Sequence, residues 1–91
     1  PETLYATLAV GNDGRVYLAW SNLDGEDKAQ IFMRTLAADG RTWSPIQQLS
    51  RAKGNAGRPV LAIMKNQLQV AWTETDGEDS RVVLRSATVN Q

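Results

Sequence analysis

Carboxylates gather in two loops of this chain that share one sequence. Asp24-Gly25-Glu26-Asp27 recurs as Asp76-Gly77-Glu78-Asp79, so each copy brings three acidic side chains into four residues. Calcium takes six to eight oxygen ligands, which makes such a loop a candidate cation site. The spacing lacks the alternate-residue oxygen ligands of a calcium loop, and Asp-Gly also favours the tip of a hairpin. We therefore expect two solvated turns and predict no metal site.

The composition argues against several other kinds of site. The chain has no histidine, the commonest general base and metal ligand, and no cysteine for thiolate chemistry or disulfides. Ten basic and ten acidic side chains cancel and are scattered, whereas nucleic-acid binders carry a basic excess or stripe. No apolar run approaches the length of a membrane span. We expect no catalytic residues, no cofactor and neither nucleic acid nor membrane as a partner.

The two acidic loops belong to a longer repeat. Residues 16–27 recur as residues 68–79, which places Trp20 and Trp72 at matching positions 52 residues apart. Short strand-like runs at a period near 50 are typical of four-stranded propeller blades, which bury their faces only against neighbouring blades. The repeat predicts one blade over residues 1–52 and a second blade, without its fourth strand, over residues 53–91. Because a blade cannot bury both faces alone, we expect a piece of a larger ring or one that assembles into a ring. The start at Pro1 rather than methionine leads us to expect a processed or excised piece.

Turn signals divide both units into short strands. Gly11-Asn12-Asp13-Gly14, Asp24-Gly25 and Asp39-Gly40 are strong hairpin turns. Strands are predicted over residues 6–10, 15–21, 29–36, 45–50, 60–64, 67–73 and 81–89, with the polar segment 51–58 as the link between units. Val16, Leu18 and Trp20 alternate with Tyr17 and Ala19, so both faces of that strand are apolar. No helical periodicity occurs, and the fold class is all-β: two antiparallel propeller blades, the second incomplete.

A seven-stranded β-sandwich is the alternative fold for the same pattern. A sandwich does not require its cycle of strands to repeat at a fixed spacing, so the propeller is favoured.

The turn after the third predicted strand carries a family resemblance. Asp39-Gly40-Arg41-Thr42-Trp43-Ser44 resembles the BNR or Asp-box repeat of sialidase-like β-propellers, Ser-x-Asp-x-Gly-x-Thr-Trp. In that alignment Ala38 takes the aspartate position and Leu36 the serine position, so the box is degenerate and Asp39 stands one place late. In the family this box is a folding element away from the active site. The resemblance implies that Asp39, Gly40, Thr42 and Trp43 are structural, with the tryptophan beneath the turn.

The propeller architecture also implies a binding rim. In a propeller, the loop between the second and third strands lies on the same face as the link between blades. This would place residues 24–27, the link 51–58 and residues 76–79 together on one rim. The candidate rim or cation-loop residues are therefore Asp24, Glu26, Asp27, Asp76, Glu78, Asp79 and Arg58. We expect these residues to form a mixed-charge surface for a carbohydrate or protein ligand.

Sialidases bind a sugar carboxylate with three arginines and use a tyrosine-glutamate nucleophile and an aspartate acid. The Arg-Ile-Pro signature of these enzymes is absent, and Arg58-Pro59 is only a loose echo of it. Arg34 and Arg85 match between the repeats and are expected to pack or pair between blades. The interpretation is a non-catalytic structural or interaction module. The alternative is a fragment of a glycan-binding or glycoside-hydrolysing, exo-sialidase-like enzyme with its catalytic residues elsewhere.

The expected partners are identical chains or the remainder of the parent propeller, because an apolar strand at an open sheet edge invites another chain. An excised fragment that rebuilds a ring by oligomerising is a further reading. The sequence itself does not locate the protein; the resemblance implies an extracytoplasmic place, periplasmic or secreted.

Overall fold

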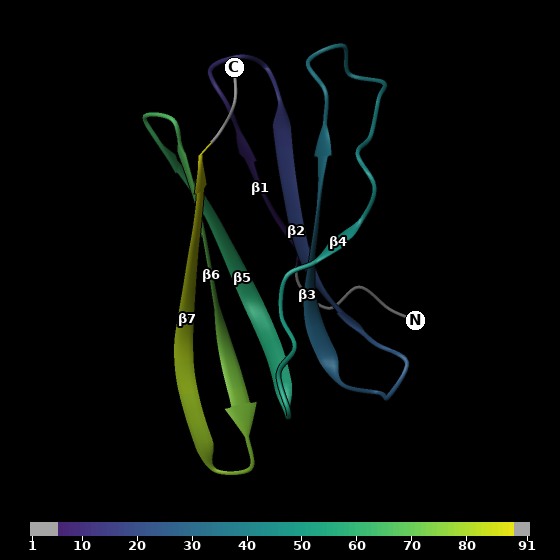
Figure 1. Ribbon diagram of the computed structural model, residues 1–91, viewed down its shortest axis with the longest axis vertical. Helices are drawn as coiled ribbons and strands as arrows, with labels where there is room; N and C mark the ends of the chain where they lie inside the picture. Colours follow the sequence, from purple (N-terminus) through teal and green to yellow (C-terminus); the bar gives the residue numbers. More distant parts are fainter. Residues whose placement is uncertain (1–5, 89–91) are drawn as a thin grey trace.

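Seven antiparallel strands form two sheets in the computed structural model, which describes residues 6–88 (Figure 1). The first sheet has the order β1-β2-β3-β4 and the second the order β5-β6-β7. The strands are β1 Ala6–Val10, β2 Val16–Leu23, β3 Ala29–Leu36, β4 Gln47–Gln48, β5 Asn55–Met64, β6 Gln67–Asp76 and β7 Asp79–Thr88. The prediction of an all-β chain with two antiparallel sheets is confirmed. The end of the predicted strand 81–89 lies outside the described residues.

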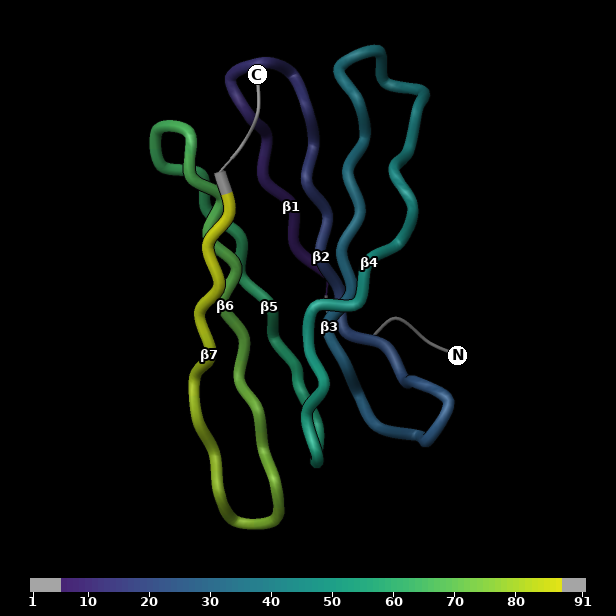
Figure 2. Tube along the Cα trace, viewed as in Figure 1, coloured from purple at the N-terminus to yellow at the C-terminus, as the bar shows by residue number. Residues whose placement is uncertain are grey.

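Each sheet is a meander in which neighbours along the chain pair with one another. The tube in Figure 2 shows the two sheets side by side, joined by the segment that leads from β4 into β5. Their facing sides enclose one apolar core, made of Tyr17, Ala19, Ile31, Ala56, Leu61, Leu68, Val70 and Trp72.

In the part of the chain that the structure describes, no helix is long and apolar enough to cross a membrane.

The predicted link between the units is too long, and the predicted fourth strand is too long as well. β5 already begins at Asn55, because β6 extends to Asp76 and offers partners to residues 55–57. The register shifts between Gly57 and Val60, where Arg58 has a φ of 55°. Such a bulge accommodates Pro59, which has no amide hydrogen to donate. β4 spans only Gln47–Gln48 of the predicted 45–50.

The two acidic loops have the same sequence at their tips and different conformations. In the second loop Asp76 pairs directly with Asp79, which leaves a two-residue turn. In the first loop the chain closes one residue later, because the amide of Asp24 donates to the carbonyl of Lys28 at 2.8 Å. The third strands are consequently 51 residues apart: Trp20 pairs with Phe32, and Trp72 with Val83.

The two sheets stack in the same sense: the side of one sheet that carries its β2 or β6 tryptophan points in the same direction as the equivalent side of the other sheet. Trp72 lies on the inner side of the second sheet and is 3% exposed. Trp20, at the matching position on β2, lies on the outer side of the first sheet and is half-buried against Phe32, with 6.2 Å between ring centroids. The two indoles therefore differ in burial, because a stack of only two sheets covers one side of each.

Candidate functional site

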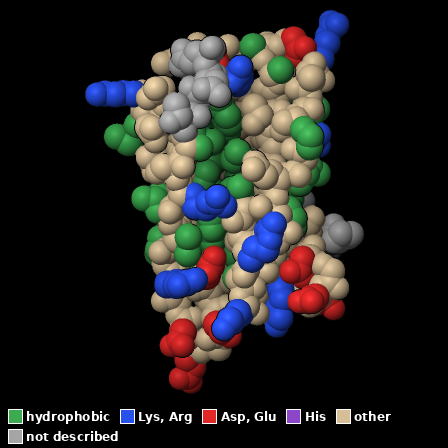
Figure 3. Space-filling model, viewed as in Figure 1, with side chains coloured by type: hydrophobic (Ala, Val, Ile, Leu, Met, Phe, Trp, Pro, Cys, Tyr) green, Lys and Arg blue, Asp and Glu red, His purple; other side chains and the backbone are tan. Residues whose placement is uncertain are grey.

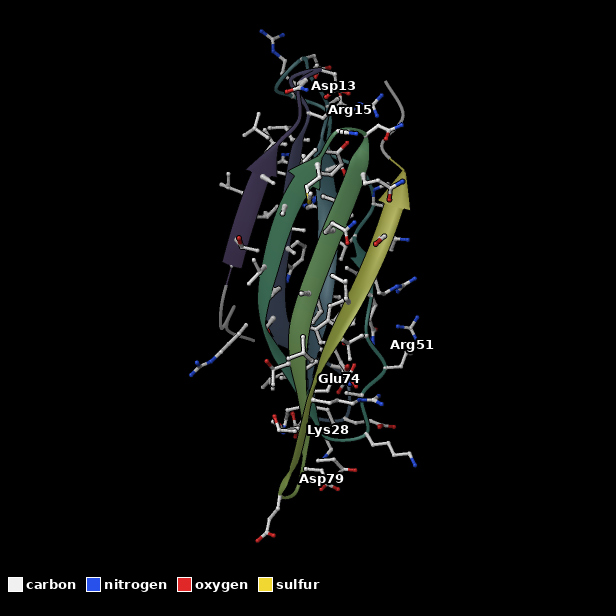
Figure 4. The ribbon with its side chains drawn as sticks, turned by 90° about the vertical axis from the view of Figure 1, so that its left-hand side faces the viewer. Asp13, Arg15, Lys28, Arg51, Glu74 and Asp79 are labelled. Carbon is white, nitrogen blue, oxygen red and sulfur yellow. The ribbon has the colours of Figure 1, made fainter. Side chains whose placement is uncertain are left out.

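Polar side chains concentrate at the lower end of the molecule as drawn in Figure 3, where the acidic and basic groups gather. A cleft of about 460 Å³ opens there between the segment that links the sheets and the β6–β7 hairpin. Figure 4 places Arg51, Glu74, Lys28 and Asp79 at this end, opposite Asp13 and Arg15. We call it the rim cleft; it is lined by Arg51, Ala52, Lys53, Gly54, Glu74, Thr75, Asp76, Asp79, Ser80 and Arg81.

Backbone contact forms the floor of the rim cleft. A β-carbon at Gly54 would overlap the carbonyl oxygen of Thr75, so the absence of a side chain lets the link lie directly on β6. This close approach places Arg51 and Lys53 in the wall of the rim cleft that faces the acidic hairpin.

Glu74 is the most enclosed charged group of the rim cleft. Its side chain is 13% exposed, against 75% for Arg81, whose guanidinium donates a hydrogen bond to Glu74 Oε1 at 2.9 Å. The indole nitrogen of Trp72 donates to Oε2, also at 2.9 Å. These donors, the indole first, lower the pKa of Glu74 despite its desolvation. With both oxygens engaged, Glu74 is a fixed anion that anchors Trp72 and Arg81.

Asp24 holds the neighbouring β2–β3 loop in shape. Its Oδ1 accepts the amides of Glu26 at 2.8 Å and Lys28 at 3.0 Å. The amide of Lys28 is the largest cause of the lowered pKa of Asp24, which favours the ionised form. Asp24 is therefore committed to its own loop.

A buried amide connects this loop to the link. Gln30 Oε1 accepts hydrogen bonds from the hydroxyl of Ser50 at 2.6 Å and from the amide of Ala52 at 3.0 Å. Its Nε2 donates to the carbonyl of Ala52 at 3.1 Å and to Asp24 Oδ2 at 3.4 Å. Both polar ends of Gln30 therefore have hydrogen-bond partners. These contacts hold the start of the link, at Ser50 and Ala52, against β3.

The predicted rim residues are only partly brought together. Asp76 and Asp79 line the rim cleft, and Asp24 reaches the link through Gln30. Glu26, Asp27 and Glu78 are exposed on their loops and do not line it, and Arg58 lies in the β5 bulge. Among residues 6–88, no group of three or more potential metal ligands lies close enough together to hold an ion.

The link that carries Arg51 and Lys53 was expected on this rim, and both residues line the rim cleft. Sequence reasoning missed Glu74 and Arg81, which also line it, and Gln30, which lies buried behind it. One signal was available for Glu74: residues two apart on a strand share a face, so Trp72 and Glu74 were neighbours by spacing. Nothing in the sequence distinguishes Gln30 from a solvent-facing strand residue.

Asp39 braces the hairpin at the opposite end. Its Oδ1 accepts the amides of Arg41 at 2.8 Å and Thr42 at 2.9 Å, and its Oδ2 accepts the hydroxyl of Thr42 at 2.7 Å. The amide of Arg41 is the largest cause of the lowered pKa of Asp39. Gly40 follows with a φ of 71°, which suits glycine. Asp39 thus bridges the turn from its position one place late.

Trp43 is 43% exposed and is not enclosed beneath this turn. It forms an isolated bridge with Leu36, and the guanidinium of Arg34 lies 4.7 Å from the centre of its ring. A cation over an indole face stabilises modestly at an exposed site. Asp39, Gly40, Thr42 and Trp43 therefore act on the shape of the hairpin.

In comparisons with known proteins, the chain matches no family model, no curated protein and no solved structure.

Proposed function

We propose that this chain is a non-catalytic structural and interaction module, made of two successive blades of a sialidase-like β-propeller. The same-sense stacking of the two repeats carries this proposal. In a β-sandwich the apolar sides of both sheets turn toward each other and polar residues face outward. Here the apolar side that Trp72 marks in the second sheet faces the core, while its counterpart at Trp20 faces outward. Successive blades of a ring repeat in this way.

The state of the carboxylates supports a role without catalysis. Glycoside hydrolysis requires a carboxylic acid whose pKa is raised, so that it can donate a proton near neutral pH. The hydrogen bonds of Asp24, Asp39 and Glu74 lower their pKa values instead. Asp24 and Asp39 accept hydrogen bonds that hold their own turns, and Glu74 accepts hydrogen bonds from Trp72 and Arg81.

The degenerate Asp-box adds support from the other end of the molecule. Asp39 and Thr42 bridge a turn through backbone amides, the bracing role that the family resemblance implies. The module would present its rim cleft, with Arg51, Lys53 and Arg81, as a surface for a ligand of mixed charge.

An activity assay tests this function against the alternative of an enzyme fragment. The purified chain is incubated with a fluorogenic sialoside and with a panel of neutral fluorogenic glycosides. We expect no turnover above a protein-free control. Turnover that disappears in Arg51→Ala or Arg81→Ala, while circular dichroism shows the fold retained, would overturn the proposal.

A further inference from the structure

Strand pairing aligns the two sheets residue by residue. Leu18 pairs with Leu8 on one side and Arg34 on the other. Val70 pairs in the same way with Leu61 and Arg85. The registers therefore make Leu18 equivalent to Val70, and they extend the match to the first and third strands of each sheet.

The outer side of the first sheet repeats an apolar set that the second sheet buries. We call this side the leading face; it consists of Leu8, Val10, Val16, Leu18 and Trp20. Their equivalents on the inner side of the second sheet are Leu61, Ile63, Leu68, Val70 and Trp72. Four of these equivalents are at most 8% exposed and Ile63 packs against them, whereas Leu8 and Val10 are each 61% exposed. The leading face is apolar at all five positions and lacks the covering sheet.

The outer side of the second sheet, in turn, repeats a set of side chains that the first sheet buries in the core. We call it the trailing face; it consists of Val60, Ala71, Val82 and Leu84, which are equivalent to Thr7, Ala19, Ile31 and Met33 of the first sheet. Ala19 and Ile31 are 0% exposed beneath the second sheet. Val60, Val82 and Leu84 are 60%, 75% and 63% exposed. Hydrophobic side chains also protrude on the second-sheet side of Figure 3.

Polar groups that join the two sheets have counterparts on the outer faces. The hydroxyl of Ser21 donates to the carbonyl of Ala56 at 3.0 Å inside the core, and Thr73 holds a hydroxyl at the equivalent position of the trailing face. Arg85 reaches from the second sheet to the carbonyl of Leu49 at 2.9 Å, as expected of a pairing between sheets. Its equivalent Arg34 stands beside the leading face, with its Nε buried and without a hydrogen-bond partner.

We infer that copies of this chain associate head-to-tail, with the leading face of one copy packed on the trailing face of the next. This partner follows from the interface inside the molecule, where an equivalent of the leading face already covers an equivalent of the trailing face. A second copy supplies both missing covers, which matters because apolar patches of this kind mark interaction sites. The inference rests on the proposed function, since it treats both sheets as blades of one ring.

Head-to-tail contacts close into a ring when the rotation between copies permits it. Propellers hold about four to eight blades, so a ring would contain roughly two to four copies.

Paired face variants test the head-to-tail geometry. The leading-face variant carries Leu8→Glu and Val10→Glu, and the trailing-face variant carries Val82→Glu and Leu84→Glu. All four side chains are more than half exposed, so the changes leave the core untouched. The control variant carries Asn12→Glu and Asn66→Glu, the same added charge at two exposed hairpin turns. The mass of each protein is measured by sedimentation velocity at micromolar concentrations, after circular dichroism has confirmed its fold.

We expect the wild type and the control variant to form oligomers and each face variant alone to be a monomer. An equimolar mixture of the two face variants should give a 1:1 dimer through the one intact pair of faces. A face variant that dimerises alone would show like-with-like pairing and overturn the inference.

A wild type that stays monomeric would also overturn it and leave the outer faces to a different sheet. That result would not touch the proposed function, which fails instead if the chain hydrolyses glycosides.

Discussion

Trp20 and Trp72 hold equivalent positions on β2 and β6, yet Trp72 is 3% exposed in the core while Trp20 faces outward and stacks on Phe32. This difference shows how the repeats are stacked. The second sheet packs on the first through its Trp72 side, whereas the equivalent Trp20 side of the first sheet faces outward. The same contrast separates Ile31, which is 0% exposed, from its equivalent Val82, which is 75% exposed.

Replacing Trp72 with alanine should destabilise the chain by about 3–5 kcal/mol, because a large buried side chain leaves a cavity. Trp43→Ala is the matched control: its indole is 43% exposed and it should cost about 1 kcal/mol through the lost contact with Arg34. Urea unfolding followed by circular dichroism measures both. Equal costs for the two changes would contradict the placement of Trp72.

Ser21→Ala should cost about 1–3 kcal/mol, because the carbonyl of Ala56 would then be buried without its hydrogen-bond donor. Ser80→Ala, on the exposed end of β7, serves as the control and should change the free energy of unfolding little. A Ser21→Ala variant as stable as the wild type would show that the hydroxyl does not join the two sheets.

Glu74 should make the stability of the chain depend on pH in the acidic range. Its pKa is lowered in the folded state, first by the indole of Trp72 and then by Arg81, so its contribution is complete above the unfolded pKa. That contribution is lost as the pH falls below about 4.5, the ordinary pKa of this side chain, and through the lowered folded value. Thermal melts of wild type and Glu74→Gln should differ near neutral pH and converge in acid. A difference in melting temperature that is constant across this range would contradict the account.

The turn at Asp39 should loosen when its carboxylate is removed. Asp39→Ala takes away the acceptor of the Arg41 and Thr42 amides, and those amides should exchange faster with deuterated water. Asp39→Asn keeps one side-chain oxygen and should preserve most of the protection. If alanine and asparagine gave identical exchange, the side chain would not brace the hairpin.

The sequence predicted the strands well wherever turn residues bounded them. Gly11 to Gly14 and Asp39-Gly40 are turns, and the alternation in residues 16–20 gave the two faces of β2. The start of β5 could not be predicted, because residues 55–57 pair only when β6 extends to Asp76. The differing acidic loops escaped prediction as well, since one added residue before β3 changes the closing hydrogen bond.

The burial of individual side chains, in the site and in the core, was harder to predict from the sequence than the strands. Periodicity showed that both faces of β2 are apolar, but it could not show which face a neighbouring sheet covers. Glu74 was missed because its role depends on two donors, one of which, Arg81, comes from the next strand. Gln30 was missed because most of the groups that satisfy it lie about 20 residues away, on the segment that leads from β4 into β5.

The central claim is that the two sheets stack in the same sense and leave the leading face open to the next copy. Fluorine NMR of the chain labelled with 5-fluorotryptophan tests this claim most directly. The three tryptophans give three signals, assigned by single Trp→Phe variants. As the protein concentration rises, the Trp20 signal should shift, because the leading face becomes covered by the next copy. The signal of Trp72 should stay in place, because its side chain is already buried in the core. A Trp20 signal that is unchanged while sedimentation shows oligomers forming would contradict head-to-tail packing through the leading face. A concentration-dependent shift of Trp72 instead would contradict the same-sense stacking of the two sheets.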